Sequence, residues 1–219
     1  MTFQLYYSPA AVSLVAHIAL EEAGLPFELQ RIDLRQGEQR TTDYLRIHPL
    51  GRVPALRLED GQVLTEVSAI LQYLDARIPE RELLPHDVQG RVRSAEWMSW
   101  FASSVHIAFL GFFVPARFTD DAAAQAALKR DGLSRFAQML QFVDERLAGP
   151  YVLGDRYSFC DTYALAFYSW GRHFGVPVSE FGRYSALAGR VLERPAVRRA
   201  LEREGLLGAG ASGVSVAAQ

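Results

Sequence analysis

Apolar and polar residues alternate at the start of the chain and then change to a helical spacing. Residues 3–7 alternate and are rich in β-formers, so they predict a half-buried strand. Ser8-Pro9 ends this strand, because proline cannot donate to a sheet ladder. From residue 10 to residue 23 apolar positions recur at helical spacing without glycine or proline, which predicts an amphipathic helix.

The same patterning extends this first pair of elements into a small αβ domain. Gly24 followed by Pro26 ends the first helix, and Asp60-Gly61 between two short apolar runs predicts a tight hairpin turn. A strand, a helix and a second strand in this order imply a parallel pair joined by a right-handed crossover. The predicted order is β-α-β-α-β-β-α, with strands at 3–7, 27–34, 55–58 and 63–64 and helices at 10–23, 43–47 and 65–77.

Strand signals disappear in the second part of the chain. Residues 79–87 carry two prolines, several charges and weak periodicity, which is typical of a linker. The sequence therefore predicts an α/β plus all-α fold, with an αβ domain at 1–78, an all-helical domain at 88–207 and a flexible tail at 208–219. Helical patterns separated by glycine or proline breaks occupy 88–113, 120–148, 158–174, 179–193 and 196–204.

Ser158 and Asp161 have the spacing of a capping box at the start of one of these helices. Each side chain can then bond the backbone N–H of the other residue, a folding feature that contributes about 1 kcal/mol, or somewhat more when buried. Cys160 lies within this motif, and we expect it to be a small core residue and not a nucleophile.

Composition narrows the classes of partner. The 219 residues carry a formal net charge of -2 with 22% charged residues, which gives no bias towards nucleic acid or an anionic membrane surface. One cysteine excludes an internal disulfide framework, and no apolar run reaches membrane-spanning length. We expect a cytoplasmic protein without a leader segment, and we assign no metal ligands.

The turn that leads from the first strand into the first helix is the first candidate for chemistry. A helix start carries unpaired N–H groups and the positive end of the helix dipole, which together favour an anion. Tyr6 and Ser13 can add hydroxyl donors there. A plain strand-turn-helix connection without any ligand accounts for the same residues.

Motifs from residue 3 to about 207 resemble those of glutathione S-transferases, and the pattern is most similar to that of the bacterial beta class. Their joint order is more specific than any one motif, and it implies a thioredoxin-like βαβαββα domain followed by the helical domain. The stretches that carry the resemblance include Leu5-Tyr6-Tyr7-Ser8-Pro9, Gly51-Arg52-Val53-Pro54, Leu64-Thr65-Glu66, Glu96-Trp97, His106, Gly154-Asp155-Arg156, Asp161 and Arg194-Pro195.

The resemblance implies roles in glutathione binding for matched positions. Pro54 would be a cis proline that directs the backbone of Val53 to the cysteinyl part of glutathione. Glu66 and the N–H of Val67 would hold the γ-glutamyl end, with Ser68 beside them. The remaining matched positions border the same cleft in the beta class, and they are Ser99, Ser103 and His106. A packed core histidine is the alternative for His106, and we expect His17 to be structural.

Departures from the related transferase classes at four positions bear on mechanism. Val12 stands where that class has a cysteine able to form a mixed disulfide with glutathione, and Ala10 aligns with the serine that theta-like relatives use. Val67 replaces a residue that is often serine or glycine, so it offers only its backbone donor. Gly37 aligns with a lysine of several beta-class members, and the candidates to replace that lysine are Arg35 or Arg40.

A thiolate can still form without that cysteine. Lowering a thiol pKa of about 8.5 by two units requires about 2.7 kcal/mol. A helix N-terminus supplies about 0.3–1 kcal/mol and a hydrogen bond to a charged acceptor about 1.5–3 kcal/mol, so one hydroxyl plus the dipole suffices. Ser13 is the first candidate donor, Tyr6 is the second, and Tyr7 alternates to the opposite face, where we expect it in the core.

The resemblance implies a homodimeric detoxification enzyme that adds the thiolate of its cosubstrate glutathione to an electrophilic, apolar or aromatic second substrate. The second pocket would be lined by Ser103, His106, Leu110 and Phe113. A glutathione-dependent isomerase or dehalogenase stays open, as does a transferase-like binding protein without catalysis. A thiol-disulfide oxidoreductase is disfavoured, because no cysteine stands at the helix start.

Overall fold

A computed structural model describes residues 2–207, and the tail expected at 208–219 lies outside the described residues. The chain forms two compact units. The first unit runs to Leu84 and resumes at Val191, while the second is Pro85–Arg190.

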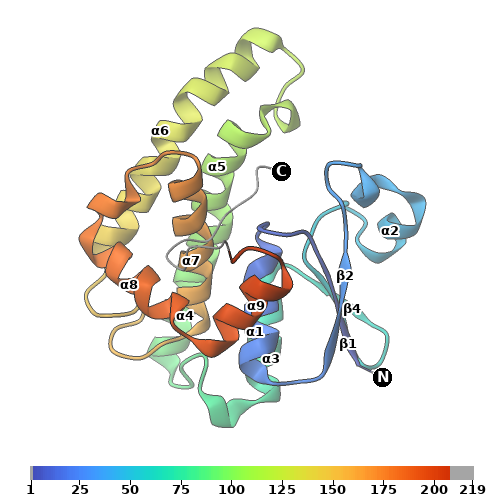
Figure 1. The fold of residues 1–219 in the computed structure, drawn as a ribbon, viewed down its shortest axis with the longest axis vertical. Helices are drawn as coiled ribbons and strands as arrows, with labels where there is room; N and C mark the ends of the chain where they lie inside the picture. Colours follow the sequence, from blue (N-terminus) through green and yellow to red (C-terminus); the bar gives the residue numbers. More distant parts are fainter. Residues whose placement is uncertain (1, 208–219) are drawn as a thin grey trace. The chain divides into compact units, whose positions relative to one another are not determined.

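A four-stranded mixed sheet forms the centre of the first unit (Figure 1). The strand order is β2-β1-β3-β4, in which β1 pairs parallel with β2 and antiparallel with β3. The predicted order of strands and helices in this half of the chain is confirmed. The strands are β1 (Phe3–Tyr7), β2 (Phe27–Arg31), β3 (Ala55–Arg57) and β4 (Val63–Thr65), and α1 (Ser13–Ala23) is the crossover between the first two.

The strand register aligns three chain segments at one edge of the sheet. Tyr6 lies opposite Ala55, and Ala55 lies opposite Thr65 on its other side. Because β3 runs antiparallel to both neighbours, its start meets the ends of β1 and β4. The residues that follow β1, precede β3 and follow β4 therefore lie together at these strand ends, and we call this end of the sheet the sheet edge.

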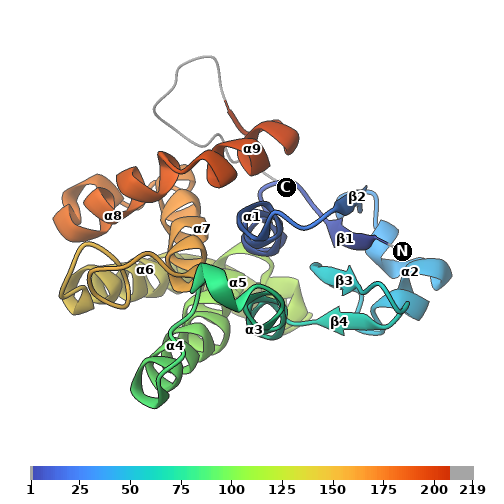
Figure 2. The same ribbon diagram turned by 90° about the horizontal axis from the view of Figure 1, so that it is seen from below.

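Helices cover both faces of the sheet. Figure 2 shows α1 and α3 (Val67–Arg77) on one face and α2 (Thr42–Ile47) on the other. Under α2, Tyr6 packs in a small core with Ile32, Tyr44 and Ala55. Single 3₁₀ turns, η1 (Glu38–Arg40) and η2 (Pro79–Arg81), lie within the connections.

The first helix differs from its prediction in two ways. It begins at Ser13 and not at residue 10, because Ala10 has a left-handed conformation with φ 59° that a right-handed helix cannot include. It is also buried along its length except at Glu21, so it is not amphipathic. One cause of this burial is α9 (Pro195–Arg203), which packs against α1 although it follows the second unit along the chain.

The second strand ends at Arg31, three residues earlier than predicted. The carboxylate of Asp33 accepts the backbone N–H groups of Arg35 and Gln36, at 3.0 and 3.2 Å. This turn competes with further strand pairing, as aspartate side chains often do.

Ion pairs attach α9 and the residue before it to α1. The guanidinium of Arg194 donates two hydrogen bonds to Glu22, at 2.6 and 2.9 Å. Arg199 and Arg203 both bind the carboxylate of Glu21 at 2.7 Å. The end of the described chain is thereby fixed onto the first helix.

The second unit is helical, as predicted, and within residues 2–207 no helix combines the length and apolar content needed to cross a bilayer. The helix expected at 88–113 contains a π-helical turn at its middle. The elements are α4 (Val88–Trp100), the π-helical turn η3 (Phe101–Val105), α5 (His106–Phe113), η4 (Pro115–Arg117), α6 (Ala122–Arg146), α7 (Phe159–His173), η5 (Val178–Glu180) and α8 (Gly182–Leu192).

The predicted capping box at the start of α7 is confirmed. The backbone N–H of Ser158 donates to Asp161 at 2.7 Å, and the other carboxylate oxygen of Asp161 accepts the N–H of Val152 at 2.7 Å. Cys160 lies between Ser158 and Asp161 in the chain and is fully buried, so its predicted position in the core is confirmed. Burial raises the pKa of its thiol.

Candidate active site at the sheet edge

Three sets of backbone groups lie unpaired at the sheet edge. Among residues 2–207, hydrogen-bond acceptors are missing for the N–H groups of Val12, Val53, Val67 and Ser68, and the carbonyl of Val53 accepts no bond. The register of β1, β3 and β4 brings these segments to one side of the sheet. Donors that the protein leaves unpaired in this way favour an anionic or peptide-like ligand.

The turn before α1 supplies the first of these donors. The N–H of Ala11 donates to the carbonyl of Ser8 at 3.1 Å, and Ala10 itself has the left-handed conformation. Val12, the residue before α1, has helical φ and ψ, and its N–H is the first that finds no acceptor in the described chain. The positive end of the α1 dipole lies at the same place.

Ser13 is fully buried and its hydroxyl is engaged with Ser8. Its Oγ accepts the N–H of Ser8 and donates to the carbonyl of Ser8, both at 3.1 Å. In this arrangement Ser13 closes the turn between β1 and α1. To act as a thiol donor it would have to release the carbonyl of Ser8.

Tyr6 and Tyr7 lie on opposite faces of the sheet, as their alternation predicts. Tyr6 packs edge-on against Tyr44 and donates its hydroxyl hydrogen to Gln4 at 2.8 Å, and burial raises its pKa. Gln4 precedes Tyr6 on β1, so this bond directs the hydroxyl away from the sheet edge. Tyr7 packs beside His17 in the core, as expected.

The Val53–Pro54 peptide bond is cis, as the resemblance implies. The hydroxyl of Tyr44 donates to the carbonyl of Arg52 at 2.6 Å and fixes the residue before Val53. The N–H and the carbonyl of Val53 have no hydrogen-bond partner in the described residues, so they can pair with a peptide in the manner of a neighbouring strand.

The turn from β4 into α3 supplies the third set of donors. Glu66 has φ 67° and ψ 122°, a conformation that residues other than glycine rarely adopt. Its carbonyl accepts the N–H groups of two residues within α3, while those of Val67 and Ser68 find no acceptor in the described range. The Glu66 side chain is exposed at this helix start. Nearby, burial lowers the pKa of His48, although the charge of Glu66 acts in the opposite direction.

A buried carboxylate from the end of α9 reaches the same turn, and sequence reasoning missed it. Glu204 accepts the N–H of Ala10 at 3.0 Å with one oxygen and contacts Nδ1 of His17 at 2.8 Å with the other. Burial raises the pKa of Glu204, and its bonds to His17 and Ala10 act against that rise. An acidic residue at the end of an arginine-rich helix looks solvated in sequence, so no local signal could have identified it.

The other predicted site residues belong to the second unit. Ser99 and Ser103 are exposed, and the hydroxyl of Ser103 donates to the carbonyl of Ser99 at 2.8 Å. The half-buried ring of His106 lies 6.0 Å from that of Phe167 and 5.5 Å from that of Trp170. These three residues belong to the second unit, whereas the other seven predicted site residues belong to the first.

Aromatic side chains continue from His106 along α5. The ring of Phe109 lies 4.3 Å from that of Trp170 and stacks on Phe113 at 5.1 Å. Phe113 also meets Phe174 at the end of α7, with ring centroids 5.5 Å apart. His106 and Phe113, two of the predicted second-pocket residues, therefore both contact an aromatic wall contributed by α7.

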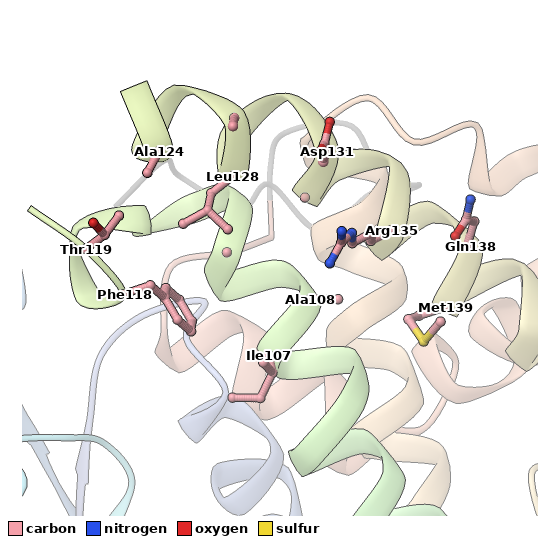
Figure 3. Close-up of a pocket in the computed structure, with 13 residues that line it drawn as sticks. Ile107, Ala108, Phe118, Thr119, Ala124, Leu128, Asp131, Arg135, Gln138 and Met139 are labelled. Carbon is pink, nitrogen blue, oxygen red and sulfur yellow. The ribbon is translucent and has the colours of Figure 1, made fainter. Parts of the chain in front are cut away.

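Another face of α5 forms a hollow of about 910 Å³ with α6 (Figure 3). Small residues on both helices leave the space, and Arg135 extends from α6 towards Ala108 across it. Ser103, His106, Leu110 and Phe113 do not line this hollow, so their placement around a second pocket stays a prediction.

A mixed sheet in the order β2-β1-β3-β4, a cis-proline segment at its edge and a helical second unit define a thioredoxin-like protein with an added helical domain. Residues 11–77 match the family described as glutathione S-transferase, N-terminal domain, and residues 101–195 match glutathione S-transferase, C-terminal domain. The chain belongs to the glutathione S-transferase family.

Individual relatives agree with this assignment. A glutathione S-transferase of Escherichia coli O157:H7 is 34% identical over 209 residues, which cover 93% of this chain and 99% of that protein. A glutathione transferase homolog from Sulfitobacter, solved with bound glutathione, has a TM-score of 0.89 at 32% identity over 92% of this chain and 98% of its own. A bacterial beta class enzyme from Sphingomonas chungbukensis has a TM-score of 0.80 at 33% identity, covering 93% and 99%.

Proposed function

We propose that this protein is a glutathione S-transferase that binds glutathione along the sheet edge and adds its thiolate to an electrophilic apolar or aromatic substrate. One observation carries the proposal: the unpaired backbone groups of three segments meet at one edge of the sheet. Their order matches a tripeptide with a carboxylate at one end, a peptide-like middle and a thiol beside the middle.

The γ-glutamyl end of glutathione is held at the start of α3. Its carboxylate accepts the N–H groups of Val67 and Ser68, where the helix dipole is also favourable. Its ammonium group pairs with the exposed carboxylate of Glu66. The cysteinyl residue pairs with the backbone of Val53, next to the cis Pro54, in the manner of an added strand.

The thiolate then lies at the start of α1. The N–H of Val12 is the first donor we assign to it, because the hydroxyl hydrogens of Ser13 and Tyr6 are already donated within the protein. A hydrogen bond to a charged acceptor contributes about 1.5–3 kcal/mol and the dipole about 0.3–1 kcal/mol, which together lower the thiol pKa by about one to three units. Ser13 and then Tyr6 are the side chains to test as further donors.

Val12 in place of the beta-class cysteine decides the type of reaction. A valine side chain forms no mixed disulfide, so the thiol of bound glutathione is the nucleophile that we assign to the turn. Addition of that thiolate to an electrophile needs no protein thiol, and the single cysteine of the chain, Cys160, is fully buried elsewhere. Conjugation is therefore favoured over thiol-disulfide exchange.

The second substrate is recognised by the helical unit. Ser99, Ser103 and His106 supply polar contacts, and the aromatic wall beside His106 and Phe113 supplies a flat apolar surface. Aromatic rings stack on such a surface with a gain of about 0.5–1.5 kcal/mol beyond their burial.

A homodimer and a cytoplasmic location complete the proposal. Val88 and Val92 lie one turn apart on α4 and are 79% and 62% exposed, and Phe142 on α6 is 40% exposed beside Trp100. Apolar side chains grouped on one unit are typical of a face that a second copy covers. Sedimentation equilibrium of the purified protein tests the dimer. The cytoplasmic location is proposed because reduced glutathione is most available as a substrate in a reducing compartment.

Calorimetry and a conjugation assay test the proposed function. We expect the purified protein to bind glutathione and to conjugate it to an activated aryl halide. Glu66→Gln should raise the KM for glutathione about tenfold because it removes the charge that pairs with the γ-glutamyl ammonium group. Glu80→Gln, an exposed control on the same unit, should change nothing.

If the protein does not bind glutathione at millimolar concentration, the proposed function is wrong. The protein is then a transferase-like binding protein that has the fold without the activity. Binding without conjugation of any electrophile in a panel would favour the isomerase or dehalogenase instead.

A further inference from the structure

The first residue after α2 is a histidine whose ring is almost completely enclosed. His48 is 4% exposed, and its backbone N–H donates to the carbonyl of Tyr44 at 2.8 Å at the end of the helix. Its Nδ1 accepts the N–H of Leu50 at 3.2 Å, two residues further along the chain. Asparagine and aspartate side chains often close a turn with this type of bond, and in this chain an imidazole does so.

The bond requires the neutral form of the imidazole. A neutral imidazole carries a hydrogen on one ring nitrogen and accepts with the other, so in His48 the acceptor is Nδ1 and the hydrogen lies on Nε2. Both nitrogens of a protonated imidazole are donors. Protonation of His48 would therefore place a hydrogen on Nδ1 opposite the N–H of Leu50, and the bond would be lost.

The turn that His48 closes leads directly to Val53. The N–H of Gly51 donates to the carbonyl of His48 at 2.8 Å, and the hydroxyl of Tyr44 donates to the carbonyl of Arg52 at 2.6 Å. Together with the imidazole bond, these contacts fix the backbone between α2 and Val53. Of the three contacts, only the one to the imidazole is broken when a histidine gains a proton.

The charges that act on the ring come from two other segments. Burial lowers the pKa of His48, the carboxylate of Glu66 acts in the opposite direction, and the guanidinium of Arg52 lowers the pKa further. The ring is therefore neutral near neutral pH and becomes charged only below the usual histidine pKa of 6.5. A charged ring would also oppose a second cation beside Glu66, where the proposed function places the ammonium group of glutathione.

We infer that His48 is a pH-sensitive positioning residue for glutathione: its neutral ring holds the turn that presents the backbone of Val53, and its protonation releases this turn and weakens binding. The inference rests on the proposed function. His48 acts through the backbone and through Glu66, and we assign it no contact with glutathione.

The direction of the pH effect follows from the two forms of the ring. The form that binds glutathione best has lost the proton, so below the usual histidine pKa binding must release a proton and the Kd rises as the pH falls. Glutathione itself keeps its charges there, since an α-carboxyl group ionises near about pH 3.5 and an α-amino group near about pH 8. Any other group of the protein that titrates in this range affects wild type and His48 variants alike.

Two substitutions of His48 and one control separate positioning from packing. His48→Asn keeps an oxygen acceptor for the N–H of Leu50 and does not titrate. His48→Ala removes the acceptor at every pH. His86→Asn is the matched control, because His86 is an exposed histidine that belongs to the second unit.

Calorimetry of glutathione binding at about pH 7 and about pH 5 is the first measurement. From the higher to the lower pH we expect the Kd to rise about fivefold in wild type and in His86→Asn, but less than about twofold in His48→Asn. His48→Ala should bind about fivefold more weakly than wild type already at the higher pH. An equal rise in wild type and His48→Asn, or an unchanged Kd in His48→Ala at the higher pH, would overturn the inference.

Hydrogen exchange at the N–H of Leu50 without ligand tests the turn independently. Its protection, corrected for the intrinsic effect of pH on exchange, should fall about fivefold in wild type between the two pH values and stay within about twofold in His48→Asn. Equal protection at both pH values in wild type would contradict the role of His48. If wild type binds no glutathione in calorimetry, the proposed function fails, and the exchange measurement still decides whether the charge of His48 controls the turn.

Discussion

Replacement of Ser13 by alanine tests how the turn and the thiol site divide their hydrogen bonds. The hydroxyl of Ser13 accepts the N–H of Ser8 and donates to the carbonyl of Ser8 at 3.1 Å, and the side chain is fully buried. Alanine keeps the helix start but removes both bonds. The structure therefore predicts a loss of stability with little change at the thiol.

The expected magnitude follows from the two bonds. In the variant the carbonyl of Ser8 still accepts the N–H of Ala11. The buried N–H of Ser8, however, loses the Oγ of Ser13 as its acceptor. Loss of one buried acceptor lowers the free energy of unfolding by about 1–3 kcal/mol. If Ser13 instead donated to the thiolate, its loss would raise the thiol pKa by about one to two units, since that bond is worth about 1.5–3 kcal/mol.

Chemical denaturation and the pH profile of conjugation distinguish the two outcomes. We expect Ser13→Ala to unfold at lower denaturant concentration and to keep the apparent thiol pKa within about 0.3 units of wild type. Ser169→Ala, which removes one bond from a buried serine to the carbonyl of Leu165 in α7, is the stability control and should cost less. A pKa rise of about one unit or more in Ser13→Ala would refute the assignment of the thiol to Val12.

Three further changes test the fold around the site. Ser158→Ala should lower the stability of the second unit by about 1–2 kcal/mol because it breaks the capping box with Asp161, and unfolding followed by circular dichroism measures this loss. Gly51→Ala should destabilise the first unit by at least about 1 kcal/mol, because the φ of Gly51 is 57° and a Cβ would lie 2.5 Å from the carbonyl oxygen of Gln39. An unchanged melting temperature of the variant would contradict this packing. Burial lowers the pKa of His48, so the unfolded state binds more protons than the folded state near that pKa. The free energy of unfolding should therefore fall as the pH drops below the usual histidine pKa of 6.5. Chemical denaturation across this pH range should show a weaker pH dependence in His48→Asn.

The order of the strands and helices could be predicted because its signals are local. Alternation marks β1, the Asp60-Gly61 pair marks the hairpin, and Ser158 with Asp161 marks the start of α7. Each of these signals spans fewer than about ten residues, so the sequence alone carries it.

The start and burial of α1 could not be predicted, because they depend on a segment about 190 residues further along the chain. The left-handed Ala10 is held by Glu204, and α9 covers a face of α1 that periodicity assigned to solvent. Local propensity favours a helix from residue 10 onwards, and the tertiary contact prevails over it.

The candidate site was predictable in part. Val53, Glu66 and Val67 were identified by resemblance, and the strand register explains why they share an edge. The engagement of the Ser13 hydroxyl with Ser8 could not be foreseen, because a serine in the first turn of a helix has several acceptors within reach and the sequence does not choose among them.

A crystal structure of the protein with glutathione would show directly which group binds the thiol. We predict that the sulfur lies within about 3.5 Å of the backbone nitrogen of Val12, with the hydroxyl of Ser13 still bonded to Ser8. A sulfur bound by the hydroxyl of Ser13 or Tyr6, or a glutathione molecule away from the sheet edge, would contradict it.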